Sequence, residues 1–324
     1  MRAAFYEKNG AAREVLRVGE IDTPVAGPGE VRVRLEFSGV NPSDVKARAG
    51  SRKITVPQLI PHSDGGGVID QVGPGVPSSR IGERVWTWNG QWKRPFGTCA
   101  EYIAVPAAMA VRLPDDVSFE AGSCLGIPAM TASHAVAVAE AGPNSTVFIS
   151  GGAGAVGHYA IQFAKARGAT VFTTISSPQK ADLARQAGAD HIINYRDENV
   201  GERVKSLTEG RGVDAMIELD IAANAKLIPE VLRPKGVVVV YGTGKPMTEL
   251  PAYFCLTNAV SLKFIFVYEI SPEERTQALQ DITNMLQAER LIHNVAQTFP
   301  LDEIVAAHET VEQGKALGNV VVKL

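Results

Sequence analysis

Three spaced glycines near the middle of the chain form its most specific chemical pattern. Gly152, Gly154 and Gly157 follow an apolar run typical of a β-strand and precede a stretch with apolar residues at helical spacing. The first glycine would permit a tight turn, the second would let a pyrophosphate approach the backbone, and the third would let helix and strand pack closely. Free N–H groups and the positive end of the helix dipole could then bind phosphates. The pattern predicts a dinucleotide-binding site; the alternative is a βα turn without a ligand.

The segments after these glycines alternate between apolar runs and helical patterns. Strands are predicted at 169–174, 191–195, 213–218 and 236–241, and helices at 178–188, 198–207 and 222–232. Short apolar strands separated by helices indicate a parallel sheet that is covered on both faces. Because crossovers in such sheets are right-handed, we predict an α/β fold that contains a doubly wound Rossmann domain.

The end of the second predicted strand should decide which dinucleotide binds. An NAD site places Asp or Glu about 20 residues after the glycines, to bind the ribose 2′-hydroxyl, and this region has no carboxylate. Ser176, Ser177 and Lys180 offer hydroxyls and a positive charge, which suit a 2′-phosphate. Tyr195, at the end of the third strand, could stack on the adenosine end. NADPH is therefore favoured over NADH; the alternative is an N-cap serine and a solvated lysine on a surface helix.

Length, charge and cysteine content argue against several other classes of protein. The 324 residues suffice for two domains, and 32 Lys and Arg against 35 Asp and Glu give a net charge of −3. No basic run suggests a nucleic-acid partner, and no apolar run is long enough to span a membrane. The N-terminus lacks the apolar stretch of a signal peptide. Three scattered cysteines fit reduced thiols, so we predict a cytoplasmic protein.

The region before about residue 117 has a different pattern. Its segments are short and alternating, as in Val31–Phe37 and Gly67–Val72, and Gly-Pro turns interrupt them. This favours antiparallel strands in a compact barrel. After one predicted helix at 273–289, the chain returns to short strands near its end. A β domain built from both ends of the chain would leave a substrate cleft between itself and the Rossmann domain.

The order of motifs over nearly the whole chain resembles the medium-chain dehydrogenases/reductases, and most closely the zinc-free, zeta-crystallin-like quinone oxidoreductases. The motifs that carry this resemblance are Val40–Asp44, Ser63–Ile69, Gly82–Val85, Ala100–Tyr102, Gly126–Thr131, Gly151–Gly157, Ile193–Arg196 and Ala306–His308. The resemblance implies a GroES-like β-barrel catalytic domain at 1–122, completed by 268–324, and a Rossmann NADP-binding domain at 123–267. It also implies a homodimer or homotetramer, with the segment at 262–267 at a subunit contact.

The residues at the zinc-ligand positions of zinc-dependent relatives indicate whether this chain could bind a catalytic zinc ion. Those relatives have a cysteine at the position of Asn41, a His-Glu pair at Ser63-Asp64, and another cysteine near Ile127. A catalytic zinc needs three protein ligands from Cys, His and carboxylate side chains, and only Asp64 is one of these. We predict no metal site, so oxidation of an alcohol, whose alkoxide a Lewis acid would stabilise, is disfavoured.

The resemblance also assigns most of the remaining candidate cofactor residues. Asn41 would lie near the nicotinamide ribose, and Ile265, Phe266 and Val267 would meet the carboxamide. The other implied cofactor contacts are Thr131, Ala153, Ala155, Val156, Tyr241, Gly242, Thr243, Gly244 and Asn319.

Two further residues are candidates for the chemistry itself. The family commonly has a tyrosine where this chain has Lys46, so a tyrosine proton donor cannot be carried over. Lys46 could donate a proton instead, or could extend into solvent. Trp92 could stack on a flat quinone, with Lys93 or Arg94 stabilising the anion; the alternative is packing within the β domain or at a subunit contact.

These observations predict an NADPH-dependent, zinc-independent reductase that transfers a hydride to quinones or α,β-unsaturated carbonyls. The resulting enolate or hydroquinone anion is delocalised, so no metal is required. An enoyl-thioester reductase is one alternative, and a non-catalytic NADPH-binding protein with a sensing or structural role is another.

Overall fold

The computed structural model describes residues 1–324 and divides them into two compact units. The first unit comprises 1–128 and 293–324, and the second comprises 129–292. None of the helices combines the length and the apolarity that crossing a membrane requires.

The first unit is mainly antiparallel β-structure. Its main sheet has the order β14-β15-β3-β4-β5-β7, with β6 also paired to β3, and β1 pairs with β2 separately. The strands are β1 (Arg2–Phe5), β2 (Arg17–Glu20), β3 (Glu30–Val40), β4 (Asp64–Val72), β5 (Arg84–Thr87), β6 (Tyr102–Pro106), β7 (Ala110–Arg112), β14 (Val295–Pro300) and β15 (Asn319–Lys323). The helices are α1 (Ala12–Val15), α2 (Pro42–Lys46), α3 (Phe119–Gly122) and α12 (Ile304–Glu312).

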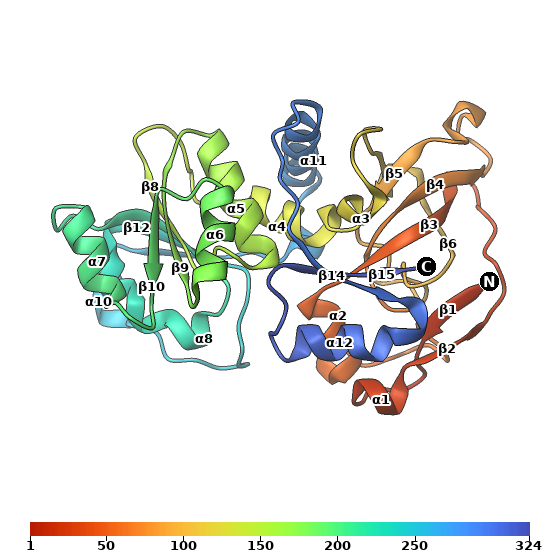
Figure 1. Ribbon diagram of the computed structural model, residues 1–324, viewed down its shortest axis with the longest axis horizontal. Coiled ribbons are helices and arrows are strands. Elements are labelled where there is room, and N and C mark those ends of the chain that lie inside the picture. Colours follow the sequence, from red (N-terminus) through yellow and green to blue (C-terminus); the bar gives the residue numbers. More distant parts are fainter. The chain divides into compact units, whose positions relative to one another are not determined.

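The two ends of the chain meet in this unit. β3 is long enough to pair with β4 along one edge, and with β6 and then β15 along the other. The antiparallel β15–β3 pairing places Val320 opposite Val40, which lies next to Asn41. Figure 1 shows β3, β4 and β5 beside one another. The predicted β domain completed by the C-terminal segment is thus present.

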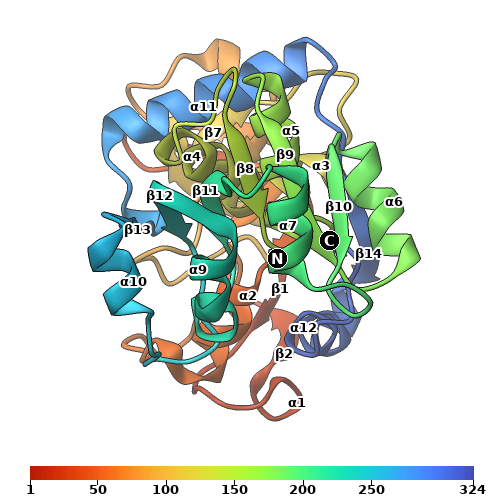
Figure 2. The same ribbon diagram turned by 90° about the vertical axis from the view of Figure 1, so that its left-hand side faces the viewer.

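The second unit is built on a six-stranded parallel sheet. Its order is β10-β9-β8-β11-β12-β13, and Figure 2 shows β10, β9, β8, β11 and β12 side by side. The strands are β8 (Thr146–Ile149), β9 (Thr170–Ile175), β10 (His191–Asn194), β11 (Val213–Glu218), β12 (Leu232–Val240) and β13 (Ser261–Phe264). The helices are α4 (Met130–Val138), α5 (Ala155–Ala166), α6 (Pro178–Gln186), α7 (Val200–Leu207), α8 (Ile221–Asn224), α9 (Ile228–Val231), α10 (Ala252–Thr257) and α11 (Pro272–Gln287).

This strand order confirms the predicted doubly wound Rossmann domain. The chain first runs outward from β8 to β10 and then continues from β11 on the other side of β8. The topological switch point therefore lies between β8 and β11, where such sheets bind ligands beyond the carboxyl ends of the strands. The sheet is held by a fully buried apolar core that includes Phe148, Met216 and Val238.

The division between the units differs from the boundaries predicted from sequence. The segment at 268–292 belongs to the second unit, because α11 packs on α4 and its Asp281 accepts hydrogen bonds from Ser133 and Arg167. A capping box formed by Ser271 and Glu274, with Pro272 in the first turn, fixes where α11 begins. The return into the first unit starts at His293 rather than at 268.

Candidate cofactor-binding site

The glycine-rich loop between β8 and α5 has the geometry that its three glycines predict. A Cβ on Gly157 would lie 2.3 Å from the carbonyl oxygen of Gly151, so helix and loop could not pack as they do with a larger residue. Gly154 is exposed, and the nearest atom to a Cβ there would be 3.2 Å away. A Cβ on Gly152 would lie 2.2 Å from Thr173 Oγ1.

One detail of this loop corrects the sequence interpretation. The residue with left-handed backbone is Gly151, at a φ of 68°, and not Gly152. Gly152 is required instead for its contact with β9, because any side chain would meet Thr173. The tight turn and the close packing are thus carried by two adjacent glycines.

The start of α5 leaves backbone donors available. Gly154 is the N-cap residue and no side chain caps the helix, whose first intrahelical bond runs from His158 N to Gly154 O. The N–H groups of Ala155, Val156 and Gly157 therefore have no partner within the helix. Together with the helix dipole, they form a site suited to a phosphate group. Ala153, also predicted in the phosphate loop, is buried.

The structure brings two of the predicted 2′-phosphate residues together at the end of β9. Lys180 Nζ donates a hydrogen bond to Ser176 Oγ over 3.1 Å, and no carboxylate bonds to either group. Ser177 is the N-cap of α6 and accepts a bond from Lys180 N over 3.4 Å. Ser177 therefore follows the alternative reading of a capping serine, whereas Ser176 and Lys180 form a cationic, hydroxyl-bearing pair. Tyr195 follows β10 with its side chain 54% exposed, so the ring is available for stacking.

Further predicted cofactor residues follow β12. Tyr241 is half-buried, and burial together with the nearby Glu218 carboxylate raises the pKa of its hydroxyl, which therefore stays protonated. A Cβ on Gly242 would lie 2.0 Å from Leu219 O, so this loop needs glycine to pack against the loop after β11. Thr243 and Gly244 are exposed, and Gly244 N donates to Asp220 Oδ1 over 2.7 Å.

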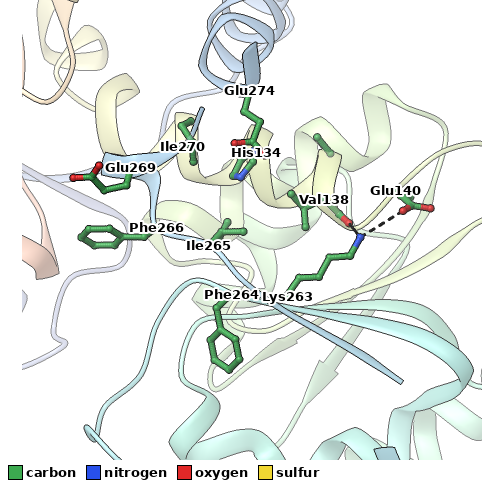
Figure 3. A pocket seen from close by; sticks show the side chains of 11 residues that line it. His134, Val138, Glu140, Lys263, Phe264, Ile265, Phe266, Glu269, Ile270 and Glu274 are labelled. Carbon is green, nitrogen blue, oxygen red and sulfur yellow. Dashed lines mark hydrogen bonds and ion pairs between the residues drawn. The ribbon is translucent and has the colours of Figure 1, made fainter. Parts of the chain in front are cut away.

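The segment after β13 borders a surface pocket of about 620 Å³ (Figure 3). Ile265 and Phe266 line it with side chains of α4 and α11, whereas Val267, the third predicted residue here, is buried. Lys263 Nζ lies 3.3 Å from Val138 O and 3.5 Å from Glu140 Oε1. Thr131 is buried in the first turn of α4, one turn before His134 of the pocket lining.

In the first unit, Asn41 is buried between two carboxyl groups. Its backbone N–H donates to Asp44 Oδ2, and its side-chain Nδ2 donates to Asp64 Oδ2, both over 2.8 Å. Asp64 Oδ2 also accepts from Ile127 N over 3.0 Å. Burial raises the pKa of both carboxyls, that of Asp44 to about 7. The two acids fix both the backbone and the side chain of Asn41.

The residues at the zinc positions of zinc-dependent relatives do not fit a zinc ion. His62 Nδ1 bonds to Ser38 Oγ and His62 Nε2 to His308 Nε2, each over 2.9 Å, so both ring nitrogens are occupied. Asp64 is 1% exposed and holds Asn41, whose amide is not a zinc ligand. No group of three or more His, Cys, Asp or Glu side chains is arranged to hold a metal ion.

The remaining candidates of the first unit have distinct surroundings. Lys46, the last residue of α2, is exposed.

The Trp92 ring is half-buried, and two cations lie near it. The Arg52 guanidinium is 4.7 Å and the Lys93 ammonium 5.6 Å from the ring centre. The guanidinium of Arg94 donates to Ala104 O and lies 3.6 Å from a carboxylate oxygen of Glu30. Asn319 Nδ2 donates to Asn294 O over 3.0 Å at the start of β15.

Sequence reasoning missed Glu218, a fully buried acid that ends β11. The side-chain amide of Asn224 donates a hydrogen bond to Glu218 Oε1 over 2.9 Å. The available signal was a carboxylate directly after the apolar run Ala215–Ile217, at the carboxyl end of the strand, where a ligand site of this fold would lie.

Comparisons with known proteins agree with this architecture. Residues 27–115 match the family described as alcohol dehydrogenase GroES-like domain, and residues 155–284 match the zinc-binding dehydrogenase family. A 2-haloacrylate reductase from Burkholderia sp is 29% identical, over 99% of this chain and 98% of that protein.

Two solved structures cover the whole chain and are themselves covered completely. The Escherichia coli quinone oxidoreductase complexed with NADPH is 25% identical with a TM-score of 0.86, and an NAD-dependent alcohol dehydrogenase is 27% identical with a TM-score of 0.90. With both domain families matched in order and quinone oxidoreductases among its full-length relatives, the chain belongs to the medium-chain dehydrogenase/reductase superfamily, in the branch of the quinone oxidoreductases.

Proposed function

We propose that this oxidoreductase uses NADPH to reduce quinones or α,β-unsaturated carbonyl compounds without zinc. The Ser176–Lys180 pair carries the choice of cofactor, since it occupies the end of β9 where an NAD site has a carboxylate. A guanidinium or ammonium group beside a phosphate oxygen makes a strong, charge-assisted hydrogen bond. The NADPH complex of the Escherichia coli relative supports the same choice.

NADPH would supply a hydride, and the acceptor would have to delocalise the negative charge that results. The proton that completes the reduction would come from Lys46 or from water, so that one hydride and one proton are consumed per acceptor. Asn41, fixed by Asp44 and Asp64, would orient the reacting groups. The name of the Burkholderia relative, a 2-haloacrylate reductase, also indicates a conjugated acceptor.

The surroundings of Trp92 favour a flat acceptor that carries negative charge. Arg52 and Lys93 place two cations near one aromatic ring, so an anion stacked there would meet both. This favours hydroquinone-forming acceptors and conjugated carboxylates over neutral enones.

Turnover would test this function. Purified protein is mixed with NADPH and one of four acceptors: 1,4-benzoquinone, a naphthoquinone, a small enone or an acrylate. Consumption of NADPH is followed by the loss of its absorbance, with and without a chelator. We expect turnover that survives the chelator and is slower with NADH. Tight NADPH binding without consumption of any acceptor would instead support the non-catalytic alternative.

We also propose that the protein forms a homodimer through β13. This strand is the outer edge of the sheet, so one row of its backbone groups can pair with another strand. Phe264, the last residue of the strand, and Phe266, two residues beyond it, are 65% and 53% exposed. The N–H of Ile265 donates to Val240 O of β12, so the N–H of Phe264 faces the outer edge. Sedimentation should give twice the monomer mass, and Phe264→Pro, which removes a backbone donor from this edge, should shift the protein toward monomer.

A further inference from the structure

Glu218 is a buried carboxylate whose oxygens are held only by neutral donors. It is the last residue of β11 and is 0% exposed. Oε2 accepts from Ser150 Oγ over 2.5 Å, and Oε1 accepts from Asp220 N over 2.6 Å and from Asn224 Nδ2 over 2.9 Å. No Lys, Arg or His forms an ion pair with it. Burying a carboxylate without a cation is unfavourable unless strong hydrogen bonds compensate, so these three bonds are essential to the arrangement.

The Ser150 bond crosses the switch point of the sheet. Ser150 follows β8 directly and precedes Gly151, the left-handed residue of the phosphate loop. Glu218 ends the neighbouring strand β11, on the other side of the point where the strand order reverses. The bond therefore fixes the start of the phosphate loop relative to the loop after β11.

The other two bonds extend the arrangement to a third loop. Glu218 holds the N–H of Asp220, and Asp220 Oδ1 in turn accepts from Gly244 N over 2.7 Å. Ile221 N donates to Gly242 O over 3.2 Å. The loops that begin at Ser150, Leu219 and Tyr241 are thus connected through one carboxylate.

We infer that Glu218 is a positioning residue for NADPH: it holds these three loops in the arrangement that binds the cofactor, without touching the cofactor itself. This inference rests on the proposed function. Both carboxylate oxygens are occupied and the residue is fully buried, so its effect must act through the loops. Pre-ordering the loops removes an entropic penalty from binding.

The test compares Glu218→Ala and Glu218→Gln with Asp214→Asn. Asp214 is on the same strand but at the amino edge, where it bonds to Thr146, Arg211 and Arg233. NADPH dissociation constants are measured by fluorescence titration, and melting temperatures are measured alongside.

We expect Glu218→Ala to raise the Kd at least about tenfold, since three hydrogen bonds are lost. Glu218→Gln should stay within about threefold of wild type, because its oxygen keeps two donors and Ser150 can accept from its amide. Asp214→Asn should lower the melting temperature and leave the Kd unchanged.

Hydrogen exchange on the free protein gives a readout without cofactor. In Glu218→Ala, peptides covering 219–224 and 241–244 should exchange faster than in wild type. The Asp220 amide loses its acceptor, and Asp220, whose carboxylate accepts from Gly244 N, is then no longer held in place. If Glu218→Ala does not fold, Ser150→Ala and Asn224→Ala each remove one donor and should each raise the Kd by a smaller factor.

An unchanged Kd and unchanged exchange in Glu218→Ala would overturn the inference while leaving the proposed function intact. An equal rise of the Kd in Asp214→Asn would also overturn it, since general destabilisation would then explain both. Wild-type protein that binds no NADPH would remove the proposed function and this inference together.

Discussion

The two ends of β11 hold acidic residues in opposite ways. At the amino end, Asp214 is bonded to the guanidinium groups of Arg211 and Arg233 at 2.9 and 2.6 Å. At the carboxyl end, Glu218 is bonded only to a hydroxyl, a backbone N–H and a side-chain amide. The strand is the same, so the difference reflects what each edge of the sheet must do.

At the amino edge, charge pairing joins strand ends and contributes to stability. Burial raises the pKa of Asp214, but hydrogen bonds from Arg211, Thr146 and Arg233 outweigh that effect and hold the pKa well below its usual range. At the carboxyl edge, neutral donors from separate loops converge on one carboxylate. Ordering those loops matters more there than ion pairing, because this edge is where doubly wound sheets bind ligands.

The largest effect should come from filling the close contact between α5 and the phosphate loop. A Cβ on Gly157 would lie 2.3 Å from Gly151 O, so Gly157→Ala must displace backbone. We expect a loss of NADPH affinity of at least about 100-fold, since a shift of the loop misplaces its phosphate donors. Isothermal titration calorimetry of wild type and variant with NADPH measures this change in affinity.

The matched control is Gly142→Ala, because Gly142 lies before the amino end of β8, the strand that leads into the phosphate loop. Gly142 precedes β8, and a Cβ there would meet nothing within 4 Å. This variant should bind NADPH like wild type. Equal losses of affinity in both variants would show that the two edges do not differ in function.

A change in stability without a change in binding should follow from Asp214→Asn. Replacing the carboxylate weakens its bonds to two arginines, so we expect unfolding to become easier by about 1–3 kcal/mol at pH 7. Chemical denaturation measures this difference.

The pH dependence of that difference follows from the sign of the pKa shift. The folded protein holds the pKa of Asp214 below its unfolded value. The stabilisation is therefore complete above about pH 4 and is lost as the pH falls below it. The gap between wild type and variant should shrink on acidification, and a gap that stays constant to pH 3 would contradict the assignment to ionised Asp214.

Sequence patterns predicted the elements of the sheet because those elements depend on local periodicity. The apolar runs that became β8, β9 and β11, and the helix that begins at Pro178, follow from residue spacing and capping. The choice of Gly151 over Gly152 for the left-handed position could not be predicted, because both residues of the pair permit it.

The polar networks could not be predicted, because their members are far apart in sequence. Glu218 and Ser150 are 68 residues apart, and His62 and His308 are 246 apart. Asn41 was identified through the family resemblance, but its side-chain partner Asp64, 23 residues away, became visible only when β3 and β4 were placed together. Such contacts depend on tertiary packing, which no local pattern encodes.

The smallest effect should come from the exposed part of the carboxyl edge. Lys180 bonds to Ser176 across the end of β9, where a 2′-phosphate would replace that bond. In Lys180→Ala we expect the Kd for NADPH to rise about tenfold, as one charge-assisted hydrogen bond is lost, and the Kd for NADH to stay unchanged. Arg185→Ala, farther along α6 and paired with Asp182 at the surface, is the control and should affect neither cofactor. If Lys180→Ala weakened both cofactors equally, Lys180 would be supporting the loop as a whole, and the selectivity for NADPH would have to arise elsewhere on this edge.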